Sequence, residues 1–317
     1  MLTDGCVQSI VYFNMSLENA ILETLAYSDI FDYPLTADEL HRFLGISASR
    51  QDIEPCAATM KDVSLKDGYY FLASRDEIVD LRKRRETVSR KVFKRAMFYG
   101  RILGALPFVR MVALTGSLAL RNCDETGDYD YMIVAKKGRV WLARAFALLL
   151  NRIAHLFGDT LCPNLIVSEN VLEWSPRNLY TAREICQMVL TCGESTYSRF
   201  RLVNNWVKEY FPNIEEEAAP GSADSKPVLQ IIVEFLLRGR LGNLIESWEM
   251  NRKIERFSRQ SGFGVETQFN VEICQGNFGH HGMLTLEKYQ QRLYGYKLDS
   301  VDFPSEYLQD QAGYVVK

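Results

Sequence analysis

The distribution of apolar residues near the start of the chain predicts a helical segment that ends in a hairpin. Apolar positions recur at helical spacing after Ser16, a residue type that caps helices well. A Thr-x-x-Glu capping box at Thr36 opens a second helix, and a third is expected to start near Ser49. Two apolar runs then flank Asp67 and Gly68, a dipeptide that favours a two-residue hairpin turn. The segment is therefore expected to fold as three helices and a hairpin.

Farther along, short apolar runs alternate with helical periodicity, which is typical of a sheet covered by helices. Buried strands are expected at residues 108–114, 129–134 and 165–167, and a long amphipathic helix at 138–157 separates the last two. Beyond these strands the patterns predict mainly helices, interrupted by a glycine-rich turn at 276–282.

Two aspartates at the start of the second expected strand carry the clearest chemical signal. Asp128 and Asp130 are two residues apart, so both carboxylates should project from one face of the strand. Adjacent carboxylates repel one another, and a divalent cation such as Mg²⁺ relieves that repulsion. Gly116 and Ser117 come between the preceding strand and a short helix, where backbone N–H groups and a hydroxyl can bind phosphate. Together these residues predict a site for Mg²⁺ or Mn²⁺ and a nucleoside triphosphate.

This arrangement resembles the nucleotidyltransferase superfamily that includes DNA polymerase beta and kanamycin nucleotidyltransferase. The family pattern is an apolar residue, Gly, Gly or Ser, a short spacer, and then Asp-apolar-Asp/Glu-apolar; here the spacer after Ser117 is ten residues long. The resemblance covers about residues 85–170. It implies that Gly116 and Ser117 hold the triphosphate, and that Asp128 and Asp130 bind the metal ions and act in catalysis.

The third carboxylate that this family usually carries on the following strand is not evident. Asn164 occupies the position where the acid is expected, and an amide cannot act as a base. Glu169, just past that strand, is the nearest acid and the candidate for the missing catalytic carboxylate, with Glu173 as the next choice. Otherwise the substrate supplies its own activation, or turnover is weak or absent.

The patterns and the resemblance together imply an α+β fold. It would consist of a small mixed-sheet nucleotidyltransferase core, an N-terminal winged-helix-like domain and a helical C-terminal domain. The winged-helix resemblance rests on the order of three helices and a hairpin. The expected divisions are a leader at 1–15, the winged-helix-like domain at 16–81, the nucleotidyltransferase-like domain at 82–217, a linker at 218–227 and the C-terminal domain at 228–317.

Basic residues are concentrated in one segment, residues 82–95, which contains eight Lys or Arg and one acid and is expected to be helical. Such a helix is commonly a solvated face, but it could also counter the phosphate charge of a nucleotide or a nucleic-acid acceptor. The winged-helix-like module is a second candidate for nucleic-acid contact, although its third helix carries little positive charge. His280 and His281 lie in the glycine-rich turn, either exposed to solvent or in contact with substrate.

The overall composition narrows the class of protein. The chain has 37 Lys and Arg against 40 Asp and Glu, a net charge of −3, which argues against a surface covered with nucleic-acid-binding charge. Seven cysteines without a Cys-x-x-Cys pair favour a reducing cytoplasm over a disulfide framework or structural zinc. No apolar run approaches the about 20 residues of a membrane span, and the first residues lack a secretory signal pattern. We therefore expect a cytoplasmic protein without membrane contact.

We predict an enzyme, a metal-dependent nucleotidyltransferase that moves a nucleoside monophosphate from a triphosphate to a hydroxyl group and releases pyrophosphate. The acceptor stays open between RNA, a protein side chain and a small molecule. The alternative is a nucleic-acid-binding regulator whose transferase domain senses a nucleotide but turns it over weakly or not at all. A third hypothesis is a partner-binding scaffold, such as one half of a toxin–antitoxin pair.

Overall fold

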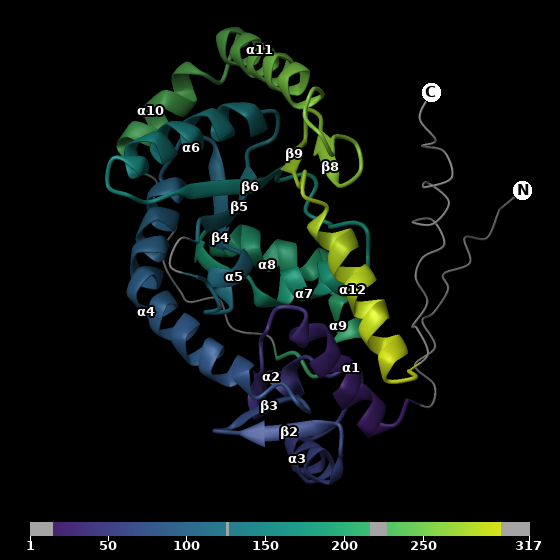
Figure 1. Ribbon diagram of the computed structural model, residues 1–317. Helices are drawn as coiled ribbons and strands as arrows, with labels where there is room; N and C mark the ends of the chain where they lie inside the picture. Colours follow the sequence, from purple (N-terminus) through teal and green to yellow (C-terminus); the bar gives the residue numbers. More distant parts are fainter. Residues whose placement is uncertain (1–14, 125–126, 216–226, 299–317) are drawn as a thin grey trace, which may run out of the picture.

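The computed structural model describes residues 15–124, 127–215 and 227–298, so almost all of the expected leader and linker lies outside the described residues. The described chain is α+β with mixed sheets, as the sequence predicted, and the larger sheet lies between helices and an N-terminal module (Figure 1). The helices are α1 (Leu17–Asp29), α2 (Ala37–Arg42), α3 (Arg50–Thr59), α4 (Glu77–Gly104), α5 (Gly116–Ala119), α6 (Val140–His155), α7 (Leu179–Gln187), α8 (Glu194–Val203), α9 (Val207–Tyr210), α10 (Val228–Leu236), α11 (Arg240–Phe257) and α12 (His281–Gly295). The strands are β1 (Leu35–Thr36), β2 (Val63–Lys66), β3 (Tyr69–Leu72), β4 (Val109–Leu114), β5 (Tyr129–Ala135), β6 (Leu161–Ser168), β7 (Val189–Cys192), β8 (Thr267–Phe269) and β9 (Ile273–Gly276).

The N-terminal module, from α1 to β3, contains the three helices and the hairpin that the sequence predicted. Its small sheet has the order β1-β3-β2, and Lys66 pairs with Tyr69 across the hairpin turn. The capping box is present, because the Thr36 hydroxyl accepts the N–H of Glu39 at 3.3 Å and the Glu39 carboxylate accepts the N–H of Thr36 at 2.9 Å. The helices enclose an apolar core that includes Leu25 and Leu40.

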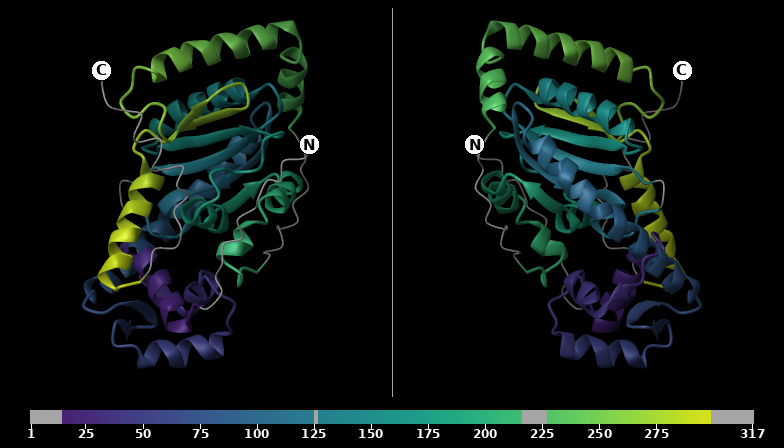
Figure 2. Two further views of the ribbon diagram at one scale, coloured as in Figure 1. Left: turned by 90° about the vertical axis from the view of Figure 1, so that its right-hand side faces the viewer. Right: turned by 90° about the vertical axis from the view of Figure 1, so that its left-hand side faces the viewer.

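The larger sheet has six strands in the order β7-β4-β5-β6-β9-β8. The β5 and β6 strands run parallel, whereas the other neighbouring pairs are antiparallel. Helices α4 and α6 pack on one face, with α11 against α6, and α7, α8 and α9 pack on the other face (Figure 2). The apolar residues between these layers form two cores separated by the sheet.

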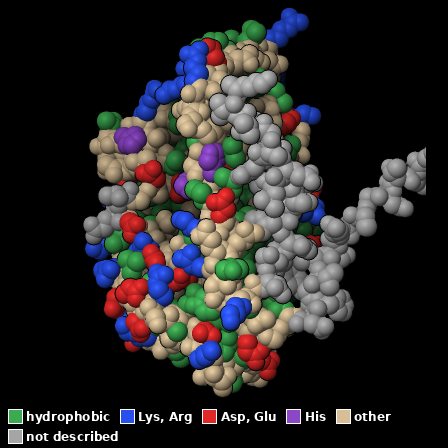
Figure 3. Space-filling view, turned by 45° about the vertical axis from the view of Figure 1, so that its right-hand side comes forward, with side chains coloured by type: hydrophobic (Ala, Val, Ile, Leu, Met, Phe, Trp, Pro, Cys, Tyr) green, Lys and Arg blue, Asp and Glu red, His purple; other side chains and the backbone are tan. Residues whose placement is uncertain are grey.

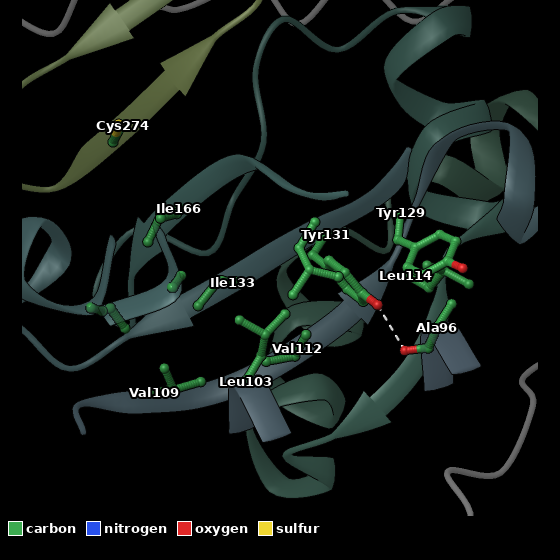
Figure 4. Close-up of a cluster of buried hydrophobic side chains, with 14 of the residues drawn as sticks. Ala96, Leu103, Val109, Val112, Leu114, Tyr129, Tyr131, Ile133, Ile166 and Cys274 are labelled. Atoms are coloured by element: carbon green, nitrogen blue, oxygen red, sulfur yellow. Dashed lines mark hydrogen bonds between the residues drawn. The ribbon is translucent and has the colours of Figure 1, made fainter. Parts of the chain in front are cut away.

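Alternation along β5 decides which way the central aspartate points. Tyr129 and Tyr131 are buried on the face covered by α4 and α6, and the Tyr131 hydroxyl donates to the Ala96 carbonyl of α4 at 2.7 Å (Figure 4). Met132 belongs to the core on the other face. Because side chains alternate along a strand, Asp130 faces the side of the sheet that carries α7.

The region after residue 228 differs from the expected helical domain. Strands β8 and β9 extend the central sheet through β6, and α12 runs back to pack against α1 and α7 (Figure 1). Likewise, α4 passes without interruption through the expected domain boundary at residues 81–82. The expected units therefore share a sheet and a helix. No helix in the described part of the chain has both the length and the apolar character needed to cross a lipid bilayer.

The basic segment 82–95 lies within α4, as predicted, but its first arginine is structural. Arg82 is 4% exposed, donates to the carboxylates of Glu39 and Glu86 at 3.0 and 2.7 Å, and lies 3.8 Å from the centre of the Tyr33 ring. Three other residues of this segment also pair with acids: Lys83 with Asp67, Arg85 with Asp124 and Arg95 with Asp159. Half of the basic cluster is thus engaged within the fold.

Replacing Arg82 with Met should lower the free energy of unfolding by about 3–5 kcal/mol, because it leaves the partly buried Glu39 carboxylate without its cation. Chemical denaturation at neutral pH measures the change. The matched control is Arg84→Met, two residues along the same helix and exposed, which should shift stability by no more than about 0.5 kcal/mol. Equal effects of the two substitutions would show that the Arg82 ion pairs do not stabilise the module.

Candidate functional site

A cavity of about 710 Å³ opens between the large sheet, the end of α1, α7 and the turn from β9 into α12. Gly116, Ser117, Asp130 and Asn164 line it from the sheet side. This volume is within the range of small-molecule sites. The cavity therefore brings together most of the residues that the sequence singled out.

The Gly116–Ser117 turn lies directly against the Asp130 carboxylate. Gly116 has φ +65°, a left-handed conformation that favours glycine, and a Cβ placed on it would overlap Asp130 Oδ2. The N–H of Thr115 donates to the Asp130 carbonyl at 2.9 Å, which fixes the end of β4 beside β5. The absence of a side chain at position 116 thus lets the backbone approach the acid closely.

The two predicted acids are both at the start of β5. Asp128 is exposed just before the strand, and Asp130 is partly buried within it. Burial raises the pKa of Asp130 to about 6, with a further contribution from the Asp128 charge, while a hydrogen bond from Asn164 acts in the opposite direction. The Asn164 amide donates to Asp130 Oδ1 at 2.6 Å. A cation bound by the carboxylate oxygens of Asp128 and Asp130 would favour the ionised form of Asp130.

The structure does not bring Glu169 to this group. In the β5–β6 ladder Asp130 pairs with Cys162, whereas Ala135 pairs with Ser168. Glu169 therefore lies at the far end of the strands, where its carboxylate accepts the N–H of Lys137 at 3.1 Å. Our expectation for Glu169 was wrong in placement because the strand runs past the cavity before that residue is reached. The other choice, Glu173, is exposed and paired with Arg177.

A different acid, Glu184, faces the cavity from α7. Burial is the main cause that raises the pKa of Glu184 to about 7, and the Asp130 charge adds to it. The side-chain amide of Gln187 donates to the Glu184 carboxylate. The sequence offered one weak signal, the charged pair Arg183–Glu184 within an otherwise uncharged helix. Glu184 is therefore a further acid at the cavity, and it lies on a helix and not on the strand where the third carboxylate was expected.

The glycine-rich turn contributes to the cavity through His281, which lines it at the start of α12. The first turn of α12 is held by Glu266, whose carboxylate accepts the N–H groups of Gly282 and Met283 at 3.1 and 2.7 Å. Trp174 also lines the cavity. None of the described cavity-lining residues comes from segment 82–95, so the basic helix is not part of this wall.

Within the described residues, no three His, Cys, Asp or Glu side chains are grouped so as to hold a metal ion by themselves. Asp128 and Asp130 are the pair that could bind one with the help of further oxygen ligands. Comparison of the chain with family profiles, curated proteins and solved structures finds no match. Its function is therefore inferred from the residues of the cavity.

Proposed function

We propose that the protein is a metal-dependent nucleotidyltransferase that transfers a nucleoside monophosphate from a triphosphate to a hydroxyl acceptor. The observation that carries the proposal is the close packing of the Gly116 backbone against the Asp130 carboxylate in the wall of the cavity. The spacing of Gly116–Ser117 and Asp128–Asp130 follows the superfamily pattern described above. Their proximity in space supports the assignment of a shared nucleotide and metal site.

The two aspartates suit a hard divalent cation: Asp130 lines the cavity, and Asp128 lies two residues before it but is not among the described residues that line it. Asp128 and Asp130 offer carboxylate oxygens, and Mg²⁺ is commonly bound by one or two carboxylates together with phosphate and water. The like-charge repulsion that contributes to the raised pKa of Asp130 is the kind of conflict that a cation relieves. When bound, Mg²⁺ would neutralise phosphate charge and favour in-line displacement.

Residues of the chain itself bind the phosphates and accept the proton. The Ser117 hydroxyl and the backbone N–H groups of the turn bind phosphate oxygens, and Glu184 takes the proton of the acceptor hydroxyl. The acceptor oxygen forms a bond to the α-phosphorus, the bond from that phosphorus to the bridging oxygen breaks, and pyrophosphate leaves with the electron pair. Asp130 and Glu184 line the same cavity, from β5 and α7, and their charges interact.

Transfer is tested by incubating the protein with each α-labelled nucleoside triphosphate and Mg²⁺ or Mn²⁺ in cell extract. We expect one class of molecule to become labelled and pyrophosphate to be released in equal amount. Absence of both with every triphosphate, together with salt-dependent binding to duplex DNA, would favour the nucleic-acid-binding regulator instead.

The Glu184 role predicts a pH dependence. A base must be deprotonated, so the transfer rate should rise as the pH increases through about 7 and then level off. Glu184→Gln should lower kcat by about a hundredfold and remove this rise. The titratable groups that line the cavity with Glu184 are Asp130, Arg183, Tyr27, Tyr33, Tyr180 and His281.

Glu169→Gln is the control for Glu184→Gln, because Glu169 lies at the far end of β6 and is expected to leave both kcat and the pH profile unchanged. Steady-state rates measured across the pH range at saturating triphosphate compare the two variants. Wild-type rates in Glu184→Gln, or a lost pH dependence in Glu169→Gln, would assign the base to another group.

A further inference from the structure

The N-terminal module forms one wall of the cavity. Tyr27 and Ser28 at the end of α1, and Phe31 just after it, line the cavity. Two hydrogen bonds fasten this wall to the segment that follows the Gly116–Ser117 turn. The Tyr33 hydroxyl donates to the Leu120 carbonyl at 3.0 Å, and the Asn122 amide donates to the Phe31 carbonyl at 3.3 Å.

The wall is also held from the other side by α12. Arg292 donates to the Asp29 carboxylate at 2.7 Å, and Arg75 donates to the same carboxylate at 3.1 Å. The rings of Tyr27 and Tyr289 meet edge to face with their centres 5.6 Å apart. The module is thus fixed in place as a structural part of the cavity.

One buried arginine at this wall has no acid within ion-pair distance among the described residues, although the charges of Glu39 and Glu184 act on it from farther away. Arg183 of α7 is 4% exposed, lies 3.3 Å from the centre of the Phe43 ring and donates to the Ser28 hydroxyl at 3.3 Å. In the described part of the chain no carboxylate forms an ion pair with it. Burial lowers the pKa of Arg183 to about 10, so it stays charged at neutral pH. Leaving a buried charge unpaired costs several kcal/mol, which an anionic ligand would offset.

Two further polar atoms at the cavity lack partners within the described residues. Asn122 is 8% exposed and its Oδ1 accepts no hydrogen bond, and the indole N–H of Trp174 donates none. Both residues line the cavity. Unsatisfied buried polar atoms are uncommon in folded proteins, so these point to a polar ligand.

Arg183 contacts the N-terminal module, and its contacts differ from those of the metal and phosphate residues. Its neighbours are Ser28, Tyr27 and Phe43 of the module, whereas the groups that shift the pKa of Asp130 are Asn164 and Asp128. An anion at Arg183 and a triphosphate at Gly116–Ser117 would thus be bound by different residues. This difference favours the acceptor as the ligand of Arg183.

The module offers little to a nucleic acid. Arg50 of α3 pairs with Asp38 and Glu54, and none of the described cavity-lining residues belongs to α2, α3 or the hairpin. On the face in Figure 3 acidic and basic side chains are interspersed over the lower part of the molecule, where the module lies. A macromolecular acceptor would need a basic surface leading into the cavity.

We propose that the acceptor is a small molecule with a phosphate or carboxylate group, bound between the N-terminal module and α7 with that group held by Arg183 and Ser28. This assignment of the acceptor rests on the proposed function. The winged-helix-like module then serves to select the acceptor, and the aromatic side chains Tyr27, Phe31 and Trp174 contact its uncharged part.

The test is calorimetric titration of the full chain with glycerol phosphate, glycerate and, as the neutral probe, glycerol. Each is titrated with and without Mg²⁺ and a non-hydrolysable triphosphate analogue. The wild type should bind one or both anions but not glycerol, and the preferred anion identifies phosphate or carboxylate. Arg183→Met should weaken that binding about tenfold or more, while the affinity for the Mg²⁺-nucleotide changes less than about twofold.

Ser28→Ala is the second variant, for the case that Arg183→Met does not fold. It is expected to weaken binding of the same anion by a smaller factor. Arg50→Gln is the control and should bind as the wild type does. Unchanged anion affinity in folded Arg183→Met, or displacement of the anion by the nucleotide, would overturn the proposal. So would salt-dependent binding of duplex DNA or RNA that Arg183→Met weakens. Failure of the proposed function can be distinguished from failure of this proposal. In that case the wild type would bind the anion but not the Mg²⁺-nucleotide.

Discussion

Replacing Asp128 and Asp130 together with Ala should abolish metal-dependent nucleotide binding and leave the protein folded. Both acids lie at the start of β5, and Asp130 lies against the Gly116 turn that would hold the phosphates. Without them a cation would keep only ligands from the nucleotide and water. We expect the affinity for the Mg²⁺-nucleotide to fall by about a thousandfold, or about 4 kcal/mol, in calorimetric titrations.

The stability of the same variant distinguishes a lost ligand from a damaged fold. The pKa of Asp130 in the folded state, about 6, is above that of the unfolded chain, so its ionisation destabilises the fold as the pH rises from about 4 to 6. The double variant should therefore be no less stable than the wild type in chelator at neutral pH. Asp124→Ala, an exposed acid that pairs with Arg85, is the control and should keep full nucleotide affinity. Unchanged nucleotide affinity in the double variant would exclude the site.

Substituting Gly116 with Ala should disrupt the site by a steric route. A methyl group at this position would overlap the Asp130 carboxylate and displace it from the turn. Because the backbone there has φ +65°, the substitution also carries a strain of about 1–2 kcal/mol. We expect nucleotide affinity and the transfer rate to fall by about a hundredfold or more, because the acid and the phosphate-binding backbone are moved together.

Gly138 provides a matched control for Gly116, since it has the same φ of +65° but open space beside it. Apart from Gly138 itself and its two neighbours in the chain, no atom of the described residues lies within 4 Å of the point that a Cβ at position 138 would occupy. Gly138→Ala should therefore lose similar stability and keep its nucleotide affinity. Denaturation curves and titrations of both variants separate backbone strain from the clash with Asp130. If both lose nucleotide affinity equally, the close approach at Gly116 has no specific role.

The sequence predicted the part of the site that depends on local geometry. The alternation along residues 129–134 predicted a strand whose two tyrosines point to the same face. In the structure both tyrosines are buried on the side of α4. The spacing of Gly116 and Asp130 predicted that a turn and a strand would meet. Strands that follow one another in the sequence usually pair, and β4 and β5 do so here, which brings the end of β4 beside the start of β5.

The parts that the sequence did not predict depend on contacts between distant segments. Glu184 reaches the cavity because α7 packs on the face toward which Asp130 points, and no spacing rule relates these two residues. The strands β8 and β9 have only three and four residues at the edge of the sheet, too few for a periodic pattern. Similarly, β7 follows α7 after a single residue, Met188, so its four residues lie in a region where the patterns predicted mainly helices.

The uninterrupted course of α4 has a consequence for how the protein melts. This helix has 28 residues, and its buried side chains contribute both to the module, through Arg82, and to the core of the large sheet, through Leu103. If either core loses its packing, part of α4 is exposed, and the other core is destabilised because the same helix packs against it. We therefore expect thermal unfolding to be a single cooperative transition, with one calorimetric peak for the whole described chain. A ligand in the cavity would then raise the melting temperature of both units together.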